Sequence, residues 1–99
     1  MKTMTPRELK RYLDELRPRR FILWTENQPW YDVADPLKLT LTFDSIHIGD
    51  DVRILTFQRN GESVGFLDGV KCIDTDACTL GTLLTVHCRD YWSYHIIAQ

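Results

Sequence analysis

The chain has 99 residues and a formal net charge of −2, and 43% of its residues are hydrophobic. This length predicts a single domain over residues 1–99, and the hydrophobic content suffices for a core without disulfides or bound metal, which argues against disorder. The longest uncharged apolar run, Phe21–Trp24, is far too short to span a bilayer, and the polar first residues lead into a helix rather than a secretory signal. Three cysteines without framework spacing indicate reduced thiols, so we expect a cytoplasmic protein with no membrane partner.

Charge is distributed unevenly along the chain. Residues 1–20 hold seven basic and three acidic side chains, a net of +4, whereas residues 21–99 carry a net of −6. A basic segment of this kind can contact phosphate groups or an acidic protein surface, and it can also complement the acidic remainder of its own domain. We favour the intramolecular interpretation, because such an asymmetry is common within folded domains.

A short amphipathic helix is predicted over residues 6–16. Thr5-Pro6-Arg7-Glu8 combines a capping box with proline at the first helical position. Apolar side chains then recur at helical spacing and form one stripe: Leu9, Tyr12, Leu13 and Leu16. Pro18 should force Arg17 out of the helical conformation and end the helix near Leu16, and residues 1–4 are expected to fray.

An aromatic loop follows the first predicted strand. Residues 20–25 favour a strand that is apolar on both faces, and the prolines of residues 26–36 favour a loop. Trp24, Trp30 and Tyr31 lie close together here, near several carboxylates, and such a set can form a small-molecule pocket. We favour the alternative that these rings turn inward and cap the open end of a sheet.

The hairpin over residues 53–67 has the clearest turn signal of the chain. Asn60-Gly61 suits a two-residue type I′ turn, because both central residues need positive φ. This turn predicts a register with one pair of opposite charges and two apolar pairs: Arg59 with Glu62, Phe57 with Val64, and Leu55 with Phe66.

Alternating hydrophobicity predicts further antiparallel strands on both sides of this hairpin. Residues 37–43 alternate strictly, residues 46–48 continue in extended form, and Gly49-Asp50-Asp51 turns the chain. After the hairpin we expect a turn or bulge at Asp68-Gly69, strands over 70–73, 82–88 and 92–98, and a polar loop over 74–81. The result is an α+β fold, with one N-terminal helix packed on a strongly bent, mostly antiparallel β-sheet or partly closed β-barrel of about six to seven strands, a meander over residues 20–98.

No complete catalytic or metal-binding motif is evident. Cys72, Cys78, His87 and Cys88 lack the paired spacing of zinc modules, and the adjacent His87 and Cys88 should leave opposite faces of a strand, with Cys88 in the core. Asp74-x-Asp76 lacks the glycine and closing glutamate of a calcium loop, and there is no G-x-S-x-G motif. We therefore expect no metal, no cofactor and no enzymatic activity.

Three short segments of the C-terminal half carry a family resemblance. Val70-Lys71-Cys72-Ile73, Leu80-Gly81-Thr82 and Tyr94–Ala98 resemble a pattern in small uncharacterised proteins of Firmicutes, some of them carried on mobile elements. The resemblance implies a bacterial, intracellular and accessory protein. It brings no assigned activity and no functional residue.

Three functions remain open at this point. We expect first a small non-catalytic protein that acts through protein–protein interaction, with a partner or with a second copy in a homodimer, because free strand edges can pair with another strand. In the first alternative, Arg17, Arg19 and Arg20 contact nucleic acid or a phosphorylated ligand, since a guanidinium group can bind two phosphate oxygens at once. The acidic remainder of the domain disfavours nucleic acid. In the second alternative, the loop with Trp24, Trp30 and Tyr31 binds a small molecule.

Overall fold

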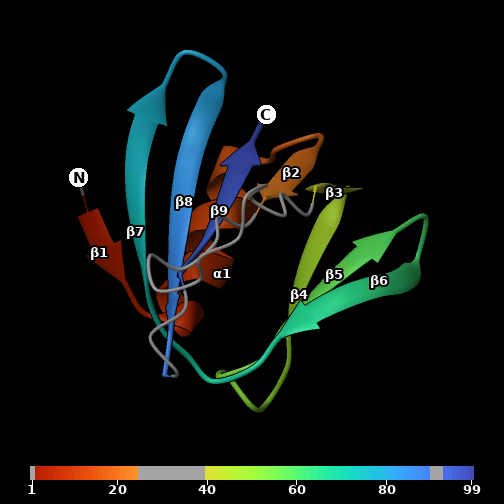
Figure 1. Ribbon diagram of the computed structural model, residues 1–99, viewed down its shortest axis with the longest axis vertical. Coiled ribbons are helices and arrows are strands. Elements are labelled where there is room, and N and C mark those ends of the chain that lie inside the picture. The colour runs from red at the N-terminus through yellow and green to blue at the C-terminus, as the bar shows by residue number, and fades with distance from the viewer. Residues whose placement is uncertain (1, 25–39, 90–92) are drawn as a thin grey trace, which may run out of the picture.

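The computed structural model describes residues 2–24, 40–89 and 93–99, and these residues form one helix and nine strands in two antiparallel sheets (Figure 1). The elements in chain order are β1 (Lys2–Met4), α1 (Pro6–Leu16), β2 (Phe21–Trp24), β3 (Thr40–Phe43), β4 (Ser45–Ile48), β5 (Leu55–Arg59), β6 (Glu62–Leu67), β7 (Val70–Cys78), β8 (Gly81–Cys88) and β9 (Ser93–Ala98). The larger sheet has the order β1-β7-β8-β9-β2-β3 and the smaller sheet the order β4-β5-β6.

The predicted combination of an N-terminal helix with antiparallel strands is confirmed, but the number of strands and the single sheet are wrong. Nine described strands replace the expected six to seven, and they divide into two sheets that do not close into one barrel. No helix among the described residues is long and apolar enough to cross a membrane.

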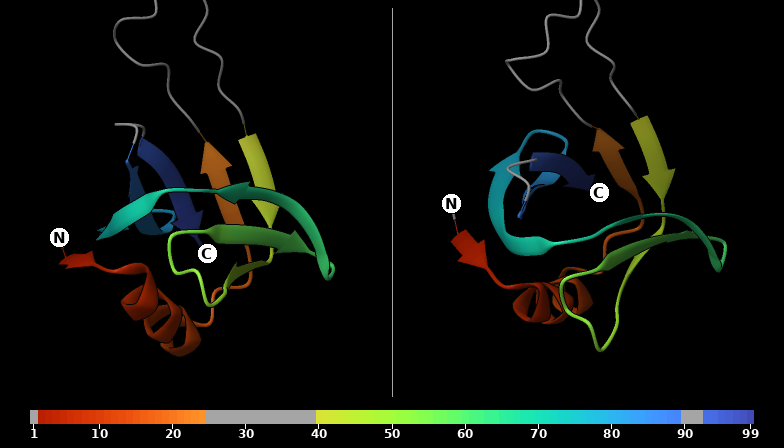
Figure 2. Two further views of the ribbon diagram at one scale, coloured as in Figure 1. Left: turned by 90° about the horizontal axis from the view of Figure 1, so that it is seen from below. Right: turned by 60° about the horizontal axis from the view of Figure 1, so that its bottom comes forward.

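Helix α1 begins and ends where the sequence predicts. The Thr5 hydroxyl accepts a hydrogen bond from the Glu8 amide at 3.2 Å, and the Glu8 carboxylate accepts one from the Thr5 amide, which completes the capping box. Arg17 adopts a left-handed conformation with φ of 50° and ends the helix before Pro18. Leu9 is fully buried, whereas Leu16 is 39% exposed, so the buried stripe is shorter than predicted. Figure 2 shows α1 at the bottom of both views, beside the segment that contains β4.

Two predictions for the larger sheet are wrong. Residues 2–4 do not fray but form β1, which pairs with β7 so that Thr3 lies opposite Asp74. Residues 74–78 are not a loop, because β7 runs as far as Cys78 and a two-residue turn leads into β8 at Gly81. The polar composition of this stretch was misleading, since the inward side chain, Thr75, is buried and its hydroxyl donates to the Lys2 carbonyl at 3.3 Å.

The central hairpin has the predicted turn but an unpredicted bulge. Asn60 and Gly61 have φ of 55° and 82°, as a type I′ turn requires, and Arg59 pairs with Glu62. The register then shifts between Phe57 and Gln58, so that Phe57 faces Gly65 and Leu55 faces Leu67. The predicted pairs of Phe57 with Val64 and Leu55 with Phe66 are therefore wrong. Gly65 leaves room for the Phe57 ring, and the shift buries Leu67 and turns Phe66 to the outside.

The two sheets meet where one extended stretch passes from the first sheet to the second. Phe43 ends β3 and Ser45 begins β4, with only Asp44 between them, and the Asp44 amide donates to the Gln58 carbonyl at 3.0 Å. Phe43 stacks on Phe21 of β2 at a centroid distance of 5.1 Å and on Phe57 of β5 at 4.4 Å. This stack of three rings joins the cores of the two sheets.

A second passage between the sheets occurs at Asp68-Gly69. Gly69 has φ of 68°, and its carbonyl accepts a hydrogen bond from the Arg89 amide at 2.8 Å. The dipeptide therefore carries the chain from β6 into β7 of the other sheet and does not form a second hairpin.

Candidate functional site

The predicted aromatic site lies largely outside the described residues. Trp30 and Tyr31 belong to residues 25–39, and the Trp24 side chain is likewise not described. The backbone of Trp24 ends β2, opposite Thr40 on one side and His95 on the other. The small-molecule pocket over residues 24–35 thus stays a prediction.

The three predicted phosphate-binding arginines lie in different surroundings. The Arg20 guanidinium donates two hydrogen bonds to the side-chain oxygen of Gln99, from Nε at 3.0 Å and from Nη2 at 2.6 Å. The Arg19 amide donates to the Gln99 carbonyl at 2.7 Å. Arg17 instead lines a cavity beside α1, together with two aspartates. None of the basic side chains among residues 2–20 forms an ion pair with another described residue. No contact in the described part of the chain therefore supports the expectation that residues 1–20 balance the acidic remainder of the domain.

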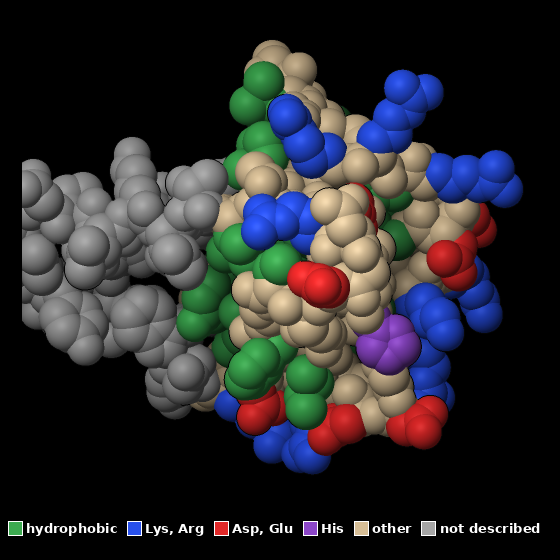
Figure 3. All heavy atoms as spheres, turned by 90° about the vertical axis from the view of Figure 1, so that its right-hand side faces the viewer, with side chains coloured by type: hydrophobic (Ala, Val, Ile, Leu, Met, Phe, Trp, Pro, Cys, Tyr) green, Lys and Arg blue, Asp and Glu red, His purple; other side chains and the backbone are tan. Residues whose placement is uncertain are grey.

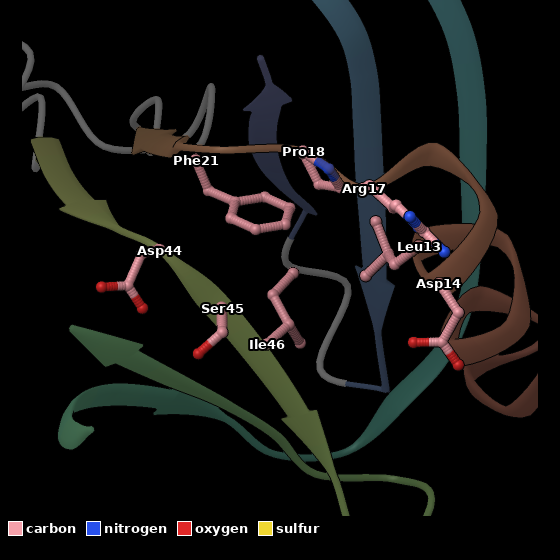
Figure 4. A pocket seen from close by; sticks show the side chains of 8 residues that line it. All are labelled: Leu13, Asp14, Arg17, Pro18, Phe21, Asp44, Ser45 and Ile46. Carbon is pink, nitrogen blue, oxygen red and sulfur yellow. The ribbon is translucent and has the colours of Figure 1, made fainter. Parts of the chain in front are cut away.

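Two cavities lie between α1 and β4, one after the other along the strand, and together we call them the groove. The first cavity has a volume of about 500 Å³, and Leu13, Phe21 and Ile46 form its apolar lining. Figure 4 shows these three side chains pointing into the space between the helix and the strand. Charged groups surround the apolar lining, namely Arg17 and the carboxylates of Asp14 and Asp44.

The second cavity lies along the same helix and strand, toward the start of α1 and the end of β4. Its volume is about 560 Å³, and its lining comprises Arg7 and Lys10 of the helix together with residues of β4 and the following turn: His47, Ile48, Gly49, Asp50 and Val52. Arg7, Lys10 and Asp14 follow one another at spacings of three and four residues, so they share one helix face along the groove, and Arg17 lies just beyond the end of α1.

The edge of β4 on the groove side has no strand beside it among the described residues. Among the described residues β4 pairs only with β5, and α1 lies beside the edge of β4 that is opposite to β5. Such an edge exposes backbone donors and acceptors that can pair with another extended chain. The groove therefore combines hydrogen-bonding backbone, an apolar cavity and charged side chains.

Charge differs between the two ends of the groove. At the Arg7 and Lys10 end basic groups outnumber the one carboxylate, Asp50, whereas at the Arg17 end two carboxylates outnumber the one arginine. In Figure 3, which faces the side of the molecule with β4 to β6, most Lys and Arg side chains lie around the upper, right-hand and lower borders, with Asp and Glu among them. This polarity gives the groove a direction.

A separate polar cluster crosses the face of the larger sheet that is turned away from the core. The Thr3 hydroxyl donates to Asp74 Oδ1 at 2.5 Å, Asp74 Oδ2 lies 2.8 Å from His87 Nε2, and His87 Nδ1 lies 3.0 Å from Ser93 Oγ. The four residues come from four neighbouring strands, β1, β7, β8 and β9, and the registers place Thr3 opposite Asp74 and His87 opposite Ser93. The sequence alone does not indicate this set, because the polar composition of residues 74–81 predicts a loop there.

The cluster keeps the Asp74 carboxylate ionised. The hydrogen bond from Thr3, and after it the one from His87, lower the pKa of Asp74 below its ordinary value of 3.8, against a smaller opposing effect of desolvation. The contact with His87 is therefore a charge-assisted hydrogen bond at neutral pH.

The three cysteines lie in different surroundings, and they do not gather with other possible metal ligands in the described part of the chain. Cys88 is buried in the core, as predicted, while Cys72 is half-buried and Cys78 exposed. Within residues 2–24, 40–89 and 93–99, no group of three His, Cys, Asp or Glu side chains is placed to hold a metal ion.

Comparison with known proteins identifies no relative. No family model matches the chain, and no curated protein and no solved structure matches it either.

Proposed function

We propose that the protein is an interaction domain that binds an extended segment of a partner protein in the groove between α1 and β4. The observation that carries this proposal is that the β4 edge, which no described strand pairs, adjoins a partly apolar cavity of about 500 Å³. In recognition by strand addition, main-chain hydrogen bonds supply affinity and side-chain pockets supply specificity. The β4 edge would supply the main-chain hydrogen bonds, and the cavity would supply the side-chain pocket.

The lining of the groove defines the chemistry of the segment. One apolar side chain of the segment would enter the cavity formed by Leu13, Phe21 and Ile46. An acidic residue toward one end would meet Arg7 and Lys10, which have no ion-pair partner among the described residues. A basic residue toward the other end would meet Asp14 and Asp44. Charge complementarity of this kind fixes direction and register more than affinity.

The test begins with selection of binders from a library of displayed linear peptides. A selected peptide is titrated into ¹⁵N-labelled protein, and we expect the largest amide shifts at residues 45–48 and along residues 10–17. The charge-reversed variant R7E/K10E should weaken binding of an acidic selected peptide at least about tenfold, or about 1.4 kcal/mol.

Arg11 supplies the matched control. It is one position from Lys10 but lines a different cavity, with Lys2, Met4 and Tyr12. R11E should leave the affinity within about twofold, since a distant surface charge contributes little. Shifts centred outside the groove, or equal losses in R7E/K10E and R11E, would contradict the proposal.

A second candidate is self-association through β6. This strand pairs only with β5 among the described strands, and its Phe66 side chain is 67% exposed. An exposed aromatic ring on an unpaired edge can pack against a second copy. Sedimentation equilibrium would show a dimer that dissociates in F66S, whereas a monomer at all concentrations would remove this candidate.

A further inference from the structure

We infer that Ser93, His87 and Asp74 form a nucleophilic site in which Ser93 attacks activated acyl groups such as esters. This inference is independent of the peptide groove and departs from the expectation that the protein has no enzymatic activity. It rests on the unbroken chain of hydrogen bonds from Thr3 through Asp74 and His87 to Ser93.

The three groups lie at distances that suit a serine nucleophile and its base. A serine nucleophile needs a base within about 2.6–3.2 Å of its oxygen, and the base needs a third group to orient it. His87 Nδ1 lies 3.0 Å from Ser93 Oγ, and Asp74 Oδ2 lies 2.8 Å from His87 Nε2. Both distances meet that requirement.

The ionised Asp74 carboxylate fixes the direction of the hydrogen bonds along the chain. An ionised carboxylate has no proton to donate, so Asp74 can only accept, and His87 Nε2 must carry a proton. In a neutral imidazole the other nitrogen, Nδ1, is then an acceptor, so the Ser93 hydroxyl donates to it. This is the arrangement in which a histidine removes the serine proton as a general base. Thr3 strengthens it, because its hydroxyl engages the second oxygen of Asp74 at 2.5 Å.

The larger sheet holds the three residues in place and leaves them partly exposed. Ser93, His87 and Asp74 lie on three hydrogen-bonded neighbours of one sheet, so their backbone positions are fixed by the ladder. The His87 side chain is 36% exposed, that of Asp74 is 23% exposed, and Ser93 is half-buried, so part of each residue is accessible to solvent. Thr85 and His95 occupy the next positions on the same face, and Thr85 Oγ1 lies 3.5 Å from His95 Nδ1.

The reaction proceeds in two balanced steps. Ser93 Oγ forms a bond to the acyl carbon while the proton of its hydroxyl moves to His87 Nδ1. The bond from the acyl carbon to the alcohol oxygen then breaks, and His87 gives its proton to the departing alcohol. Water then attacks the acyl group on Ser93 and gives a proton to His87. The ester bond to Oγ breaks, Ser93 recovers the proton, and a carboxylic acid is released.

A fluorophosphonate probe tests the site directly, since it reacts with activated serines by forming a bond from Oγ to phosphorus and releasing fluoride. We expect peptide mapping to show Ser93 modified at least about tenfold faster than Ser63, an exposed serine on β6 in the same molecule. H87Q should lower the Ser93 rate about a hundredfold or more, the range of general-base catalysis. S93A should abolish labelling at that position and the release of p-nitrophenol from p-nitrophenyl acetate above the background rate.

Two outcomes would overturn the inference. One is modification of Ser93 at the rate of Ser63 in the unaltered protein, a comparison that needs no variant to fold. The other is a Ser93 rate unaffected by H87Q in protein whose amide spectrum shows the native fold, because Ser93 would then react without His87.

Discussion

Removal of the Phe43 ring should lower the free energy of unfolding by about 4–5 kcal/mol. Phe43 is 2% exposed and contacts Phe21 and Phe57 on either side, so the ring belongs to the cores of both sheets. Truncation of a buried phenylalanine to alanine costs about 3–5 kcal/mol, from lost burial and from the cavity left behind. Two aromatic pairs are lost as well, each contributing about 0.5–1.5 kcal/mol, which places F43A at the upper end of that range.

Urea unfolding followed by far-UV circular dichroism measures this loss. With a slope of about 2 kcal/mol/M, the midpoint of F43A should fall by about 2 M. F43L, which keeps most of the volume, should cost less than F43A, and F66A, at an exposed ring, should stay within about 0.5 kcal/mol. If F43A cost no more than F66A, Phe43 would not join the two sheets as described.

Three further predictions concern single positions. D74N should lower the free energy of unfolding at neutral pH. The difference from the unaltered protein should shrink as the pH falls through the lowered pKa of Asp74 in the folded state, because the stability that a lowered carboxyl pKa contributes is present above the ordinary pKa of 3.8 and is lost when the carboxylate is protonated. Urea midpoints measured over a pH series would show this difference. G81A should lower the free energy of unfolding, measured by thermal unfolding, by at least about 2 kcal/mol, because Gly81 has φ of 143° and an added β-carbon would overlap the Ala98 carbonyl oxygen. An unchanged stability would show that the turn rearranges freely. T5A should lower the free energy of unfolding by about 1 kcal/mol, because the hydrogen bond from the Glu8 amide to the Thr5 hydroxyl is lost, and T5S should restore most of that stability.

Features that depend on neighbouring residues could be predicted from the sequence. The capping box at Thr5 and the turn at Asn60-Gly61 follow from local stereochemistry, and both form as expected. The face of β8 that carries Leu84, Val86 and Cys88 is buried because strand periodicity sets it.

Features that depend on distant segments could not be predicted in the same way. β1 is a strand only because β7 offers an edge 69 to 73 positions away, and the Asp- and Thr-rich part of β7 is a strand because β1 and β8 enclose it. The bulge in the hairpin follows from the need to bury Leu67, which competes with the register that the turn alone would impose.

The candidate sites belong to this second group. Asp74, His87 and Ser93 carry no spacing motif, and only the registers of three strands bring them together. Likewise, the groove arises because the chain passes from one sheet to the other at Asp44, which leaves one edge of β4 without a strand among the described residues. A sequence pattern that marked each strand correctly would still not have revealed either site.

The pairing of early strands with late ones sets the order of events during synthesis. β2 needs β9 and β1 needs β7, so a nascent chain that has emerged as far as β6 cannot assemble the larger sheet. Helix α1, with 11 residues, is too short to be stable alone during that interval. The β5–β6 hairpin closes across a two-residue turn, so its contacts are the most local of the strand pairs that can form before β7 emerges. Folding on the ribosome should therefore begin in the middle of the chain, with the amino-terminal segments held unassembled and open to chaperones until Ala98 has emerged.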